Sequence, residues 1–193
     1  AGAGGQTAPA DIRAKRPLMK ITRISLWHVP LTSHATYYMA GGKTCDTVTT
    51  VVPRVDTDAR ISGWGEVCPI PHYLPAYAGG VAPALTELAP ILIGADPVGP
   101  EALIDKLNRH LLDHRYAKSA IDTALWDITA QAAKLPLYTL LGGRQQTDMP
   151  LYHSITSVAP DEMARIAADA QAKGMTQFRS EERRVGKECR SRW

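Results

Sequence analysis

Acidic side chains are the first candidates for chemistry in this sequence. Asp122 and Asp127 interrupt an otherwise apolar stretch, and Glu66 lies near the end of a segment that we expect to be a strand. A site for a divalent cation such as Mg²⁺ needs several oxygen ligands brought together, so one isolated carboxylate makes no metal site. We therefore predict that the two aspartates cap, pair or hydrogen-bond locally, and that Glu66 reaches a partner in a loop.

The cysteines and tryptophans indicate packing rather than catalysis. Cys45, Cys68 and Cys189 are widely spaced and odd in number, and they show neither a CxxC motif nor a Cys/His metal-ligand spacing. This pattern predicts free thiols and a cytoplasmic protein. The tryptophans that we expect in the core are Trp27, Trp64 and Trp126.

Net charge and hydropathy exclude two classes of partner. The chain has 193 residues and a formal net charge of +3, and residues 179–193 carry that whole excess, with six basic and three acidic side chains. We therefore predict no nucleic-acid partner. No apolar run is long enough to cross a bilayer, so we predict no membrane partner. Residues 1–18 lack the apolar core of a secretory signal and are interpreted as a disordered leader, with a translation start assigned too early as the alternative.

The elements that would position any site begin with short strands. The sequence predicts strands at Lys20–Pro30, Cys45–Asp56 and Ile61–Val67, which form an antiparallel meander. We expect one loop between the first two strands, at Leu31–Thr44, and a second loop after the third strand, at Cys68–Gly80. Pro53 is awkward within the second strand, because proline donates no hydrogen bond to a ladder.

Helices and a second strand pattern come after the meander. Apolar stretches predict helices at Val81–Ile93 and Gly99–His114. Further along, Met149–Thr156 is typical of a strand, Pro160–Lys173 of a helix and Met175–Phe178 of another strand. A strand–helix–strand unit predicts a parallel crossover, unlike the meander that precedes it.

Between these two patterns, Ala117–Gly143 predicts an alanine-rich helix and a turn. Its small and apolar residues recur with a period of 3.6. That face consists of Ala117, Ala120, Ile121, Ala124, Leu125, Ile128 and Ala132. Many alanines on one face indicate that the helix backbone closely approaches a rigid element. Pro136 ends the helix, and Gly142 and Gly143 end the short apolar segment Leu137–Leu141.

This run resembles the signature of the mandelate racemase/muconate lactonizing enzyme family, within the enolase superfamily. The residues in register with that signature are Ala117, Ser119, Ala120, Ile121, Asp122, Ala124, Asp127, Ala130, Gln131, Pro136, Leu137, Leu140 and Gly142. An ordinary alanine-rich core helix is the alternative. The resemblance implies an α+β capping domain, a three-stranded antiparallel meander plus helices, at residues 19–145. It implies the first βα unit of a truncated (β/α)8 barrel at residues 146–179.

The resemblance also implies an activity. In members of the family a base abstracts the proton α to a carboxylate and Mg²⁺ holds the enediolate that forms. These members are racemases, epimerases or dehydratases, and they are often homo-oligomers. The segments at residues 19–31, 61–77, 140–143 and 151–155 look closest to the hydroxyproline dehydratase and proline-betaine epimerase branch. The two expected loops would then close over a small-molecule carboxylate substrate. Tyr37, Tyr38 and Tyr73 are the candidate substrate-binding residues, since aromatic rings suit a quaternary ammonium group; packing of each tyrosine against the cap is the alternative.

The sequence departs from the family near its end. A Lys-x-Lys motif that supplies the family's base would fall near positions 181 and 183, where this chain has Glu181 and Arg183. Residues 180–193 show neither strand alternation nor an apolar helix face, and we expect the native sequence to stop at about Phe178 or Arg179; a genuine but divergent tail is the alternative. The family's metal ligands lie on later strands, so we assign no catalytic or metal residue. The alternative function is a non-catalytic cap module that acts through binding or assembly.

Overall fold

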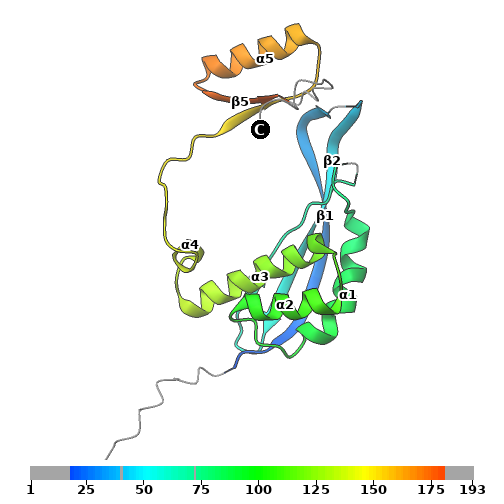
Figure 1. The fold of residues 1–193 in the computed structure, drawn as a ribbon, viewed down its shortest axis with the longest axis vertical. Helices are drawn as coiled ribbons and strands as arrows, with labels where there is room; N and C mark the ends of the chain where they lie inside the picture. The colour runs from blue at the N-terminus through cyan, green and yellow to red at the C-terminus, as the bar shows by residue number, and fades with distance from the viewer. Residues whose placement is uncertain (1–17, 40, 72, 181–193) are drawn as a thin grey trace, which may run out of the picture.

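The computed structural model describes residues 18–39, 41–71 and 73–180 (Figure 1). Its elements are β1 (Ile21–Met39), β2 (Lys43–Thr57), β3 (Ser62–Trp64), η1 (Ala78–Gly80), α1 (Val81–Leu92), α2 (Pro100–His110), α3 (Arg115–Ala133), α4 (Leu137–Leu140), β4 (Tyr152–Ile155), α5 (Pro160–Ala172) and β5 (Gln177–Ser180). The leader expected at 1–18, apart from Leu18, and the tail expected at 180–193, apart from Ser180, lie outside the described residues, as do Cys189, Glu181 and Arg183.

The first sheet is antiparallel with the order β1-β2-β3. The pairing of β1 with β2 runs from Ile21↔Thr57 to Met39↔Lys43, with register shifts between Ile21 and Arg23 and between Thr32 and Tyr37. Residues 31–39 and 43–48 form a long projecting ribbon that we call the hairpin arm. The expectation that Leu31–Thr44 is a loop was wrong for most of that segment. Cross-strand partners such as Leu31↔Val48 stabilise an extended backbone that the sequence of one strand does not reveal.

Pro53 fits the central strand because of its position along β3. Its carbonyl accepts a hydrogen bond from the Gly65 amide at 3.0 Å. In an antiparallel ladder the N–H and C=O of one residue face the same neighbour, so the donor that proline lacks also faces this side. Since β3 already ends at Trp64, the missing donor costs the sheet no bond between regular strands.

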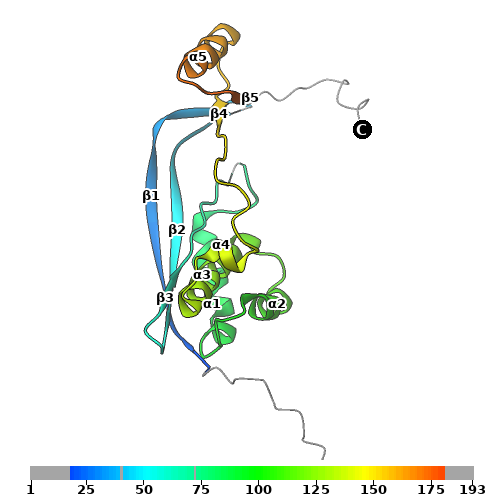
Figure 2. The ribbon, with the colours of Figure 1, turned by 90° about the vertical axis from the view of Figure 1, so that its left-hand side faces the viewer.

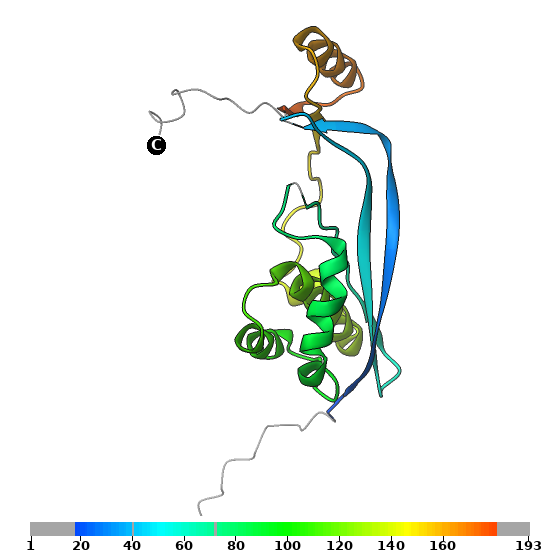
Figure 3. The same ribbon diagram turned by 90° about the vertical axis from the view of Figure 1, so that its right-hand side faces the viewer.

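All helices that pack on the sheet lie on one of its faces, as Figures 2 and 3 show from opposite sides. The face of α3 that lies closest to β3 carries Ala120 and Ala124. A Cβ added to Gly63 would lie 2.1 Å from the Ala124 carbonyl oxygen, and one added to Gly65 would lie 1.8 Å from that of Ala120. This confirms that the alanines of α3 permit close backbone approach, and the rigid element is β3.

The core lies between the sheet and helices α1, α2 and α3. Its fully buried large side chains include Ile21, Leu88, Leu92, Leu107, Ile121, Leu125, Ile128, Val51 and Val55. The expectation that Trp27 and Trp64 belong to the core was wrong. They are 42% and 47% exposed and stack on each other on the uncovered face of the sheet, with the Arg54 guanidinium 5.5 Å from the Trp27 ring centroid. Trp126 is half-buried.

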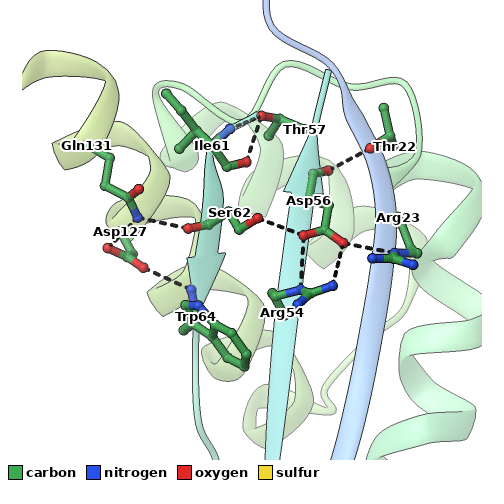
Figure 4. Close-up of polar contacts among 10 residues, drawn as sticks. All are labelled: Thr22, Arg23, Arg54, Asp56, Thr57, Ile61, Ser62, Trp64, Asp127 and Gln131. Atoms are coloured by element: carbon green, nitrogen blue, oxygen red, sulfur yellow. Dashed lines mark hydrogen bonds and ion pairs between the residues drawn. The ribbon is translucent and has the colours of Figure 1, made fainter. Parts of the chain in front are cut away.

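Polar contacts fix β3 between its neighbours (Figure 4). The Asp127 carboxylate accepts a hydrogen bond from the Trp64 amide at 2.9 Å and one from Gln131 Nε2 at 3.0 Å. On the opposite side of β3, Ser62 Oγ donates to Asp56 at 2.7 Å. The local hydrogen bonds predicted for Asp127 are thus present, and they join the signature helix to the sheet.

A second unit, β4-α5-β5, follows an extended connection at residues 141–151. Strands β4 and β5 are parallel, with registers from Tyr152↔Gln177 to Ile155↔Ser180, and α5 forms the crossover between them. This confirms the predicted parallel crossover. The architecture is therefore a three-stranded antiparallel meander with helices, followed by the first βα unit of a parallel sheet.

Candidate functional site

A cavity of about 270 Å³ lies where the hairpin arm, the segment after β3 and the second unit meet. It is lined by Tyr37, Met39, Cys45, Ile70, Tyr73, Ser154 and Arg179. Most of these side chains are apolar or aromatic, and the hydroxyl groups belong to Tyr37, Tyr73 and Ser154. Such a lining, with few polar groups on an apolar wall, is typical of a small-molecule site.

The hairpin arm supplies one wall of the cavity because of strand alternation. Residues two apart on a strand point to the same face, and so do direct cross-strand partners. Tyr37 and Met39 are two apart on β1, and Cys45 is the cross-strand partner of Tyr37. These three residues therefore form one surface of the arm, and all of them line the cavity.

The second unit supplies the facing wall from the carboxyl ends of its strands. Ser154 on β4 and Arg179 on β5 are register partners in the parallel pair, and both line the cavity. Ligand sites of parallel α/β sheets and barrels form at this end of the strands. The location of the cavity thus follows from the topology of β4 and β5 as well as from its lining.

Hydrogen bonds join the arm to β4 at the edge of the cavity. The hydroxyls of Tyr37 and Ser154 lie 2.6 Å apart. The Tyr38 amide donates to Thr156 Oγ1 at 2.6 Å, and Thr156 Oγ1 donates to the Tyr38 carbonyl at 2.9 Å. The Ser157 amide donates to the same carbonyl at 2.9 Å.

The structure separates the predicted substrate-binding residues. Tyr37 and Tyr73 lie together in the cavity lining, whereas Tyr38 does not line it and is 46% exposed. Tyr38 contributes through its backbone instead, because neighbouring residues of a strand point to opposite faces. Sequence reasoning missed Met39, Cys45 and Ser154 as lining residues. The alternation of Tyr37 and Met39 was the available signal for the first of them.

Charge at the cavity comes from Arg179. Hydrogen bonds and charge interactions with Tyr152 and Tyr73 raise the pKa of this guanidinium, which remains cationic. The nearby thiols are free, and burial raises the pKa of Cys68 above its ordinary value despite a hydrogen bond with Thr50.

The described residues do not fit a magnesium site. Residues 18–39, 41–71 and 73–180 contain no group of three or more His, Cys, Asp or Glu side chains that could hold a metal ion. The expected loop partner of Glu66 was wrong, because its carboxylate accepts a hydrogen bond from Thr50 Oγ1 of strand β2 at 2.7 Å. Asp127 is bonded to β3 and α3. The expectation that Asp122 caps, pairs or hydrogen-bonds locally was wrong, because its carboxylate has no such partner in the described part of the chain and the N-cap of α3 is His114.

A more polar hollow at the start of α3 has a structural explanation. It is lined by Asn108, Asp113, Arg115 and Lys118. Lys118 is buried and its Nζ donates to the carbonyl of Leu111, the residue that follows α2. A cation at the C-terminal end of a helix satisfies a free carbonyl and interacts favourably with the helix dipole. We therefore assign Lys118 to helix capping.

Comparison with known families identifies the capping region. Residues 21–142 match the model of the mandelate racemase / muconate lactonizing enzyme, N-terminal domain. The chain belongs to this family. The mandelate racemase/muconate lactonizing enzyme domain therefore includes the sheet, helices α1 to α4 and the hairpin arm, and its signature helix is α3. The structure confirms the fold class that the signature implied.

Individual relatives of this chain include a dehydratase and a racemase. It is 40% identical over 162 residues to cis-3-hydroxy-L-proline dehydratase of Roseibium aggregatum, covering 83% of this chain and 44% of that protein. It is 30% identical to N-succinyl-L-Arg/Lys racemase of Bacillus cereus, with the same coverage of each chain. The chain thus spans less than half the length of the relatives it matches.

A solved structure supports the same assignment. An enolase superfamily member from Roseovarius nubinhibens, determined in complex with magnesium, superposes with a TM-score of 0.77 and 37% identity. The match covers 84% of this chain and 44% of that one. Magnesium is therefore the metal of a structural relative in this family. In the described part of the present chain, no helix combines the length and apolar character needed to cross a membrane.

Proposed function

We propose that the cavity is the part of a substrate pocket that a capping domain contributes to a Mg²⁺-dependent enzyme. That enzyme abstracts the proton α to the carboxylate of a small substrate, as a racemase, epimerase or dehydratase in the cytoplasm. The observation that carries the proposal is the meeting of Tyr37 and Tyr73 in one apolar cavity at the carboxyl end of β4. The catalytic base and metal ligands would belong to parts of the barrel that the described residues do not include.

The cavity favours a small cyclic amino-acid derivative as the substrate class. Aromatic faces attract cations, and a quaternary ammonium ion has no hydrogen-bond donor to leave unsatisfied in an apolar pocket. A proline betaine carries that cation, and cis-3-hydroxy-L-proline is the compound that names one relative. We propose Tyr37 and Tyr73 as residues that contact this ring system, and Tyr38 as a residue that supports them through its backbone.

Titration of the 193-residue chain tests the pocket directly. Ring signals of labelled tyrosines are followed by NMR while proline betaine or cis-3-hydroxy-L-proline is added. We expect the Tyr37 and Tyr73 signals to shift, and Tyr73→Leu to weaken binding of the betaine by about two- to fivefold while Tyr73→Phe retains it. Tyr138→Phe is the matched control, since Tyr138 lies on α4 and does not line the cavity. Shifts at Tyr138 alone would contradict the proposal.

The second candidate function is a non-catalytic cap module. The lack of a metal-binding cluster in the described residues favours it. Exchange of the substrate α-proton in D₂O with Mg²⁺ separates the two candidates. Mg²⁺-dependent exchange by the pure chain would exclude a purely non-catalytic module. Binding without exchange would leave the pocket assignment in place and restrict this chain to the module.

A further inference from the structure

The contact between the hairpin arm and β4 satisfies an exposed sheet edge in an unusual way. β1 is the edge strand of the first sheet, so alternate residues on it direct their N–H and C=O away from β2. Tyr38 is such a residue. The Thr156 hydroxyl accepts from its amide and donates to its carbonyl, at 2.6 and 2.9 Å. One side-chain hydroxyl thus takes the place of a neighbouring strand.

Strand alternation places a second hydroxyl beside the first. Ser154 and Thr156 are two residues apart at the end of β4, so both point to the same side of the chain. Ser154 lies against the Tyr37 hydroxyl at 2.6 Å, while Thr156 binds the backbone of the next residue. Ile155, between them, is buried, and by the same alternation its side chain points the other way. Consecutive residues of the arm are therefore held by alternate residues at the end of β4.

We infer that Thr156 and Ser154 are positioning residues that fix Tyr37 in the wall of the cavity. Thr156 holds the backbone of the arm at Tyr38 against the end of β4. Ser154 holds the Tyr37 ring in its orientation. The Ser157 amide adds a third bond, to the Tyr38 carbonyl. The inference rests on the proposed function only in that the cavity is taken as the substrate pocket. The shape of that pocket would then be set by the first parallel strand as well as by the arm.

The bond between Thr156 and the backbone of the arm is tested by amide hydrogen exchange of the 193-residue chain, without any ligand. In Thr156→Val, which keeps the shape but removes the hydroxyl, we expect the Tyr38 amide to exchange on the order of tenfold faster. Thr156→Ser restores the hydroxyl and is expected to exchange within about twofold of the parent. The Val51 amide, bonded to Val67 at 2.8 Å in the sheet, reports in every variant that the domain is folded.

A matched control removes an equivalent hydroxyl elsewhere. Thr123 Oγ1 bonds to the Ser119 carbonyl within α3, so Thr123→Val should leave Tyr38 exchange unchanged. Ser154→Ala tests the second role. It should shift the ring signals of Tyr37, assigned by their loss in Tyr37→Phe, while Tyr38 exchange stays within about twofold of the parent. If Ser154 and Thr156 only attached the second unit to the arm, removal of either hydroxyl would change both the Tyr38 exchange rate and the Tyr37 ring signals.

Three outcomes would overturn the inference. Tyr38 exchange that is unchanged in Thr156→Val would show that the hydroxyl does not hold the arm. Equal rates in Thr156→Ser and Thr156→Val would have the same meaning. Unmoved Tyr37 ring signals in Ser154→Ala would remove the positioning role of Ser154. Because no ligand is used, these results are independent of the betaine titration, so a failed titration would reject the pocket and not the hydroxyl contacts.

Discussion

Gly65 and Ala120 are in backbone contact: a Cβ at Gly65 would lie 1.8 Å from the Ala120 carbonyl oxygen. The partner of this contact is backbone within a helix and cannot rotate away. Gly65, the residue that follows β3, is therefore required by the close approach of this end of β3 to α3. Glycine at position 65 and alanine at position 120 together allow the two backbones to pack closely.

Gly65→Ala should destabilise the domain by about 3 kcal/mol, because β3 must move away from α3 to admit the methyl group. Urea denaturation followed by far-UV circular dichroism measures the change. Gly79→Ala is the control, since its Cβ would lie 3.3 Å from the Tyr77 ring, a contact that the side chain can relieve. Equal stability of the two variants would contradict the close approach of β3 to α3.

Asp56 should make the sheet sensitive to acid. Burial raises its pKa, but hydrogen bonds from Ser62, Arg23 and Arg54 outweigh burial and lower the pKa below the ordinary 3.8. A lowered pKa in the folded state stabilises the protein above pH 3.8, and this stability is lost as pH falls through the folded value. Asp56→Asn should cost about 1 kcal/mol at neutral pH and much less in acid. Unfolding curves at pH 7 and pH 3 check this, and a penalty independent of pH would exclude the carboxylate charge as the cause.

Asp122 should behave in the opposite way. Burial, followed by the nearby charge of Glu101, raises its pKa above 3.8. Its ionisation therefore opposes folding, and stability falls as pH rises from 3.8 through the folded pKa. Asp122→Asn should stabilise the isolated chain at neutral pH by about half a kcal/mol. The same pair of unfolding curves tests this, and a loss of stability at pH 7 would reveal a favourable partner for the carboxylate.

The capping domain should fold without the second unit. Its core lies within residues 19–133, whereas the connection to β4 is largely exposed and the contacts of the second unit with the arm are a few hydrogen bonds. Limited trypsin digestion should therefore cut early at Arg144 and leave a protected fragment close to residues 19–145. Mass spectrometry identifies the fragment. Its absence would mean that the cap depends on residues 146–179.

Periodicity predicted the helices because the core selects a repeating apolar face. Helix α3 was found within a few residues, and its alanines correctly indicated a close neighbour. The hairpin arm was missed because both ends of the segment from Leu31 to Met39 pair with a distant stretch of β2. Between them lies a register shift, where residues such as Ser33, His34 and Ala35 have little strand preference of their own.

Only those site residues that carry a local sequence signal were predicted. Tyr37 and Tyr73 were selected because aromatic residues in expected loops are a local signal. Ser154 and Thr156 were missed because their partners lie 117 and 118 residues earlier in the chain, and no periodicity encodes a contact between a hairpin tip and a distant strand. The exposure of Trp27 and Trp64 was missed for the same reason, since which face of a sheet is covered depends on where the helices return.

The length of the arm also determines where the wall of the pocket lies. Each residue of a strand advances it by about 3.3 Å, so the number of residues between the core and Tyr37 sets how far the cavity wall lies from the helices. The two strands of the arm differ in residue number, because the register shifts between Thr32↔Thr47 and Tyr37↔Cys45 and leaves residues 33–36 of β1 opposite residue 46 of β2. Such a bulge absorbs residues gained or lost on one strand, so the side chains beyond it keep their faces. The depth of the pocket is therefore adjustable at this bulge without a change in the rest of the sheet.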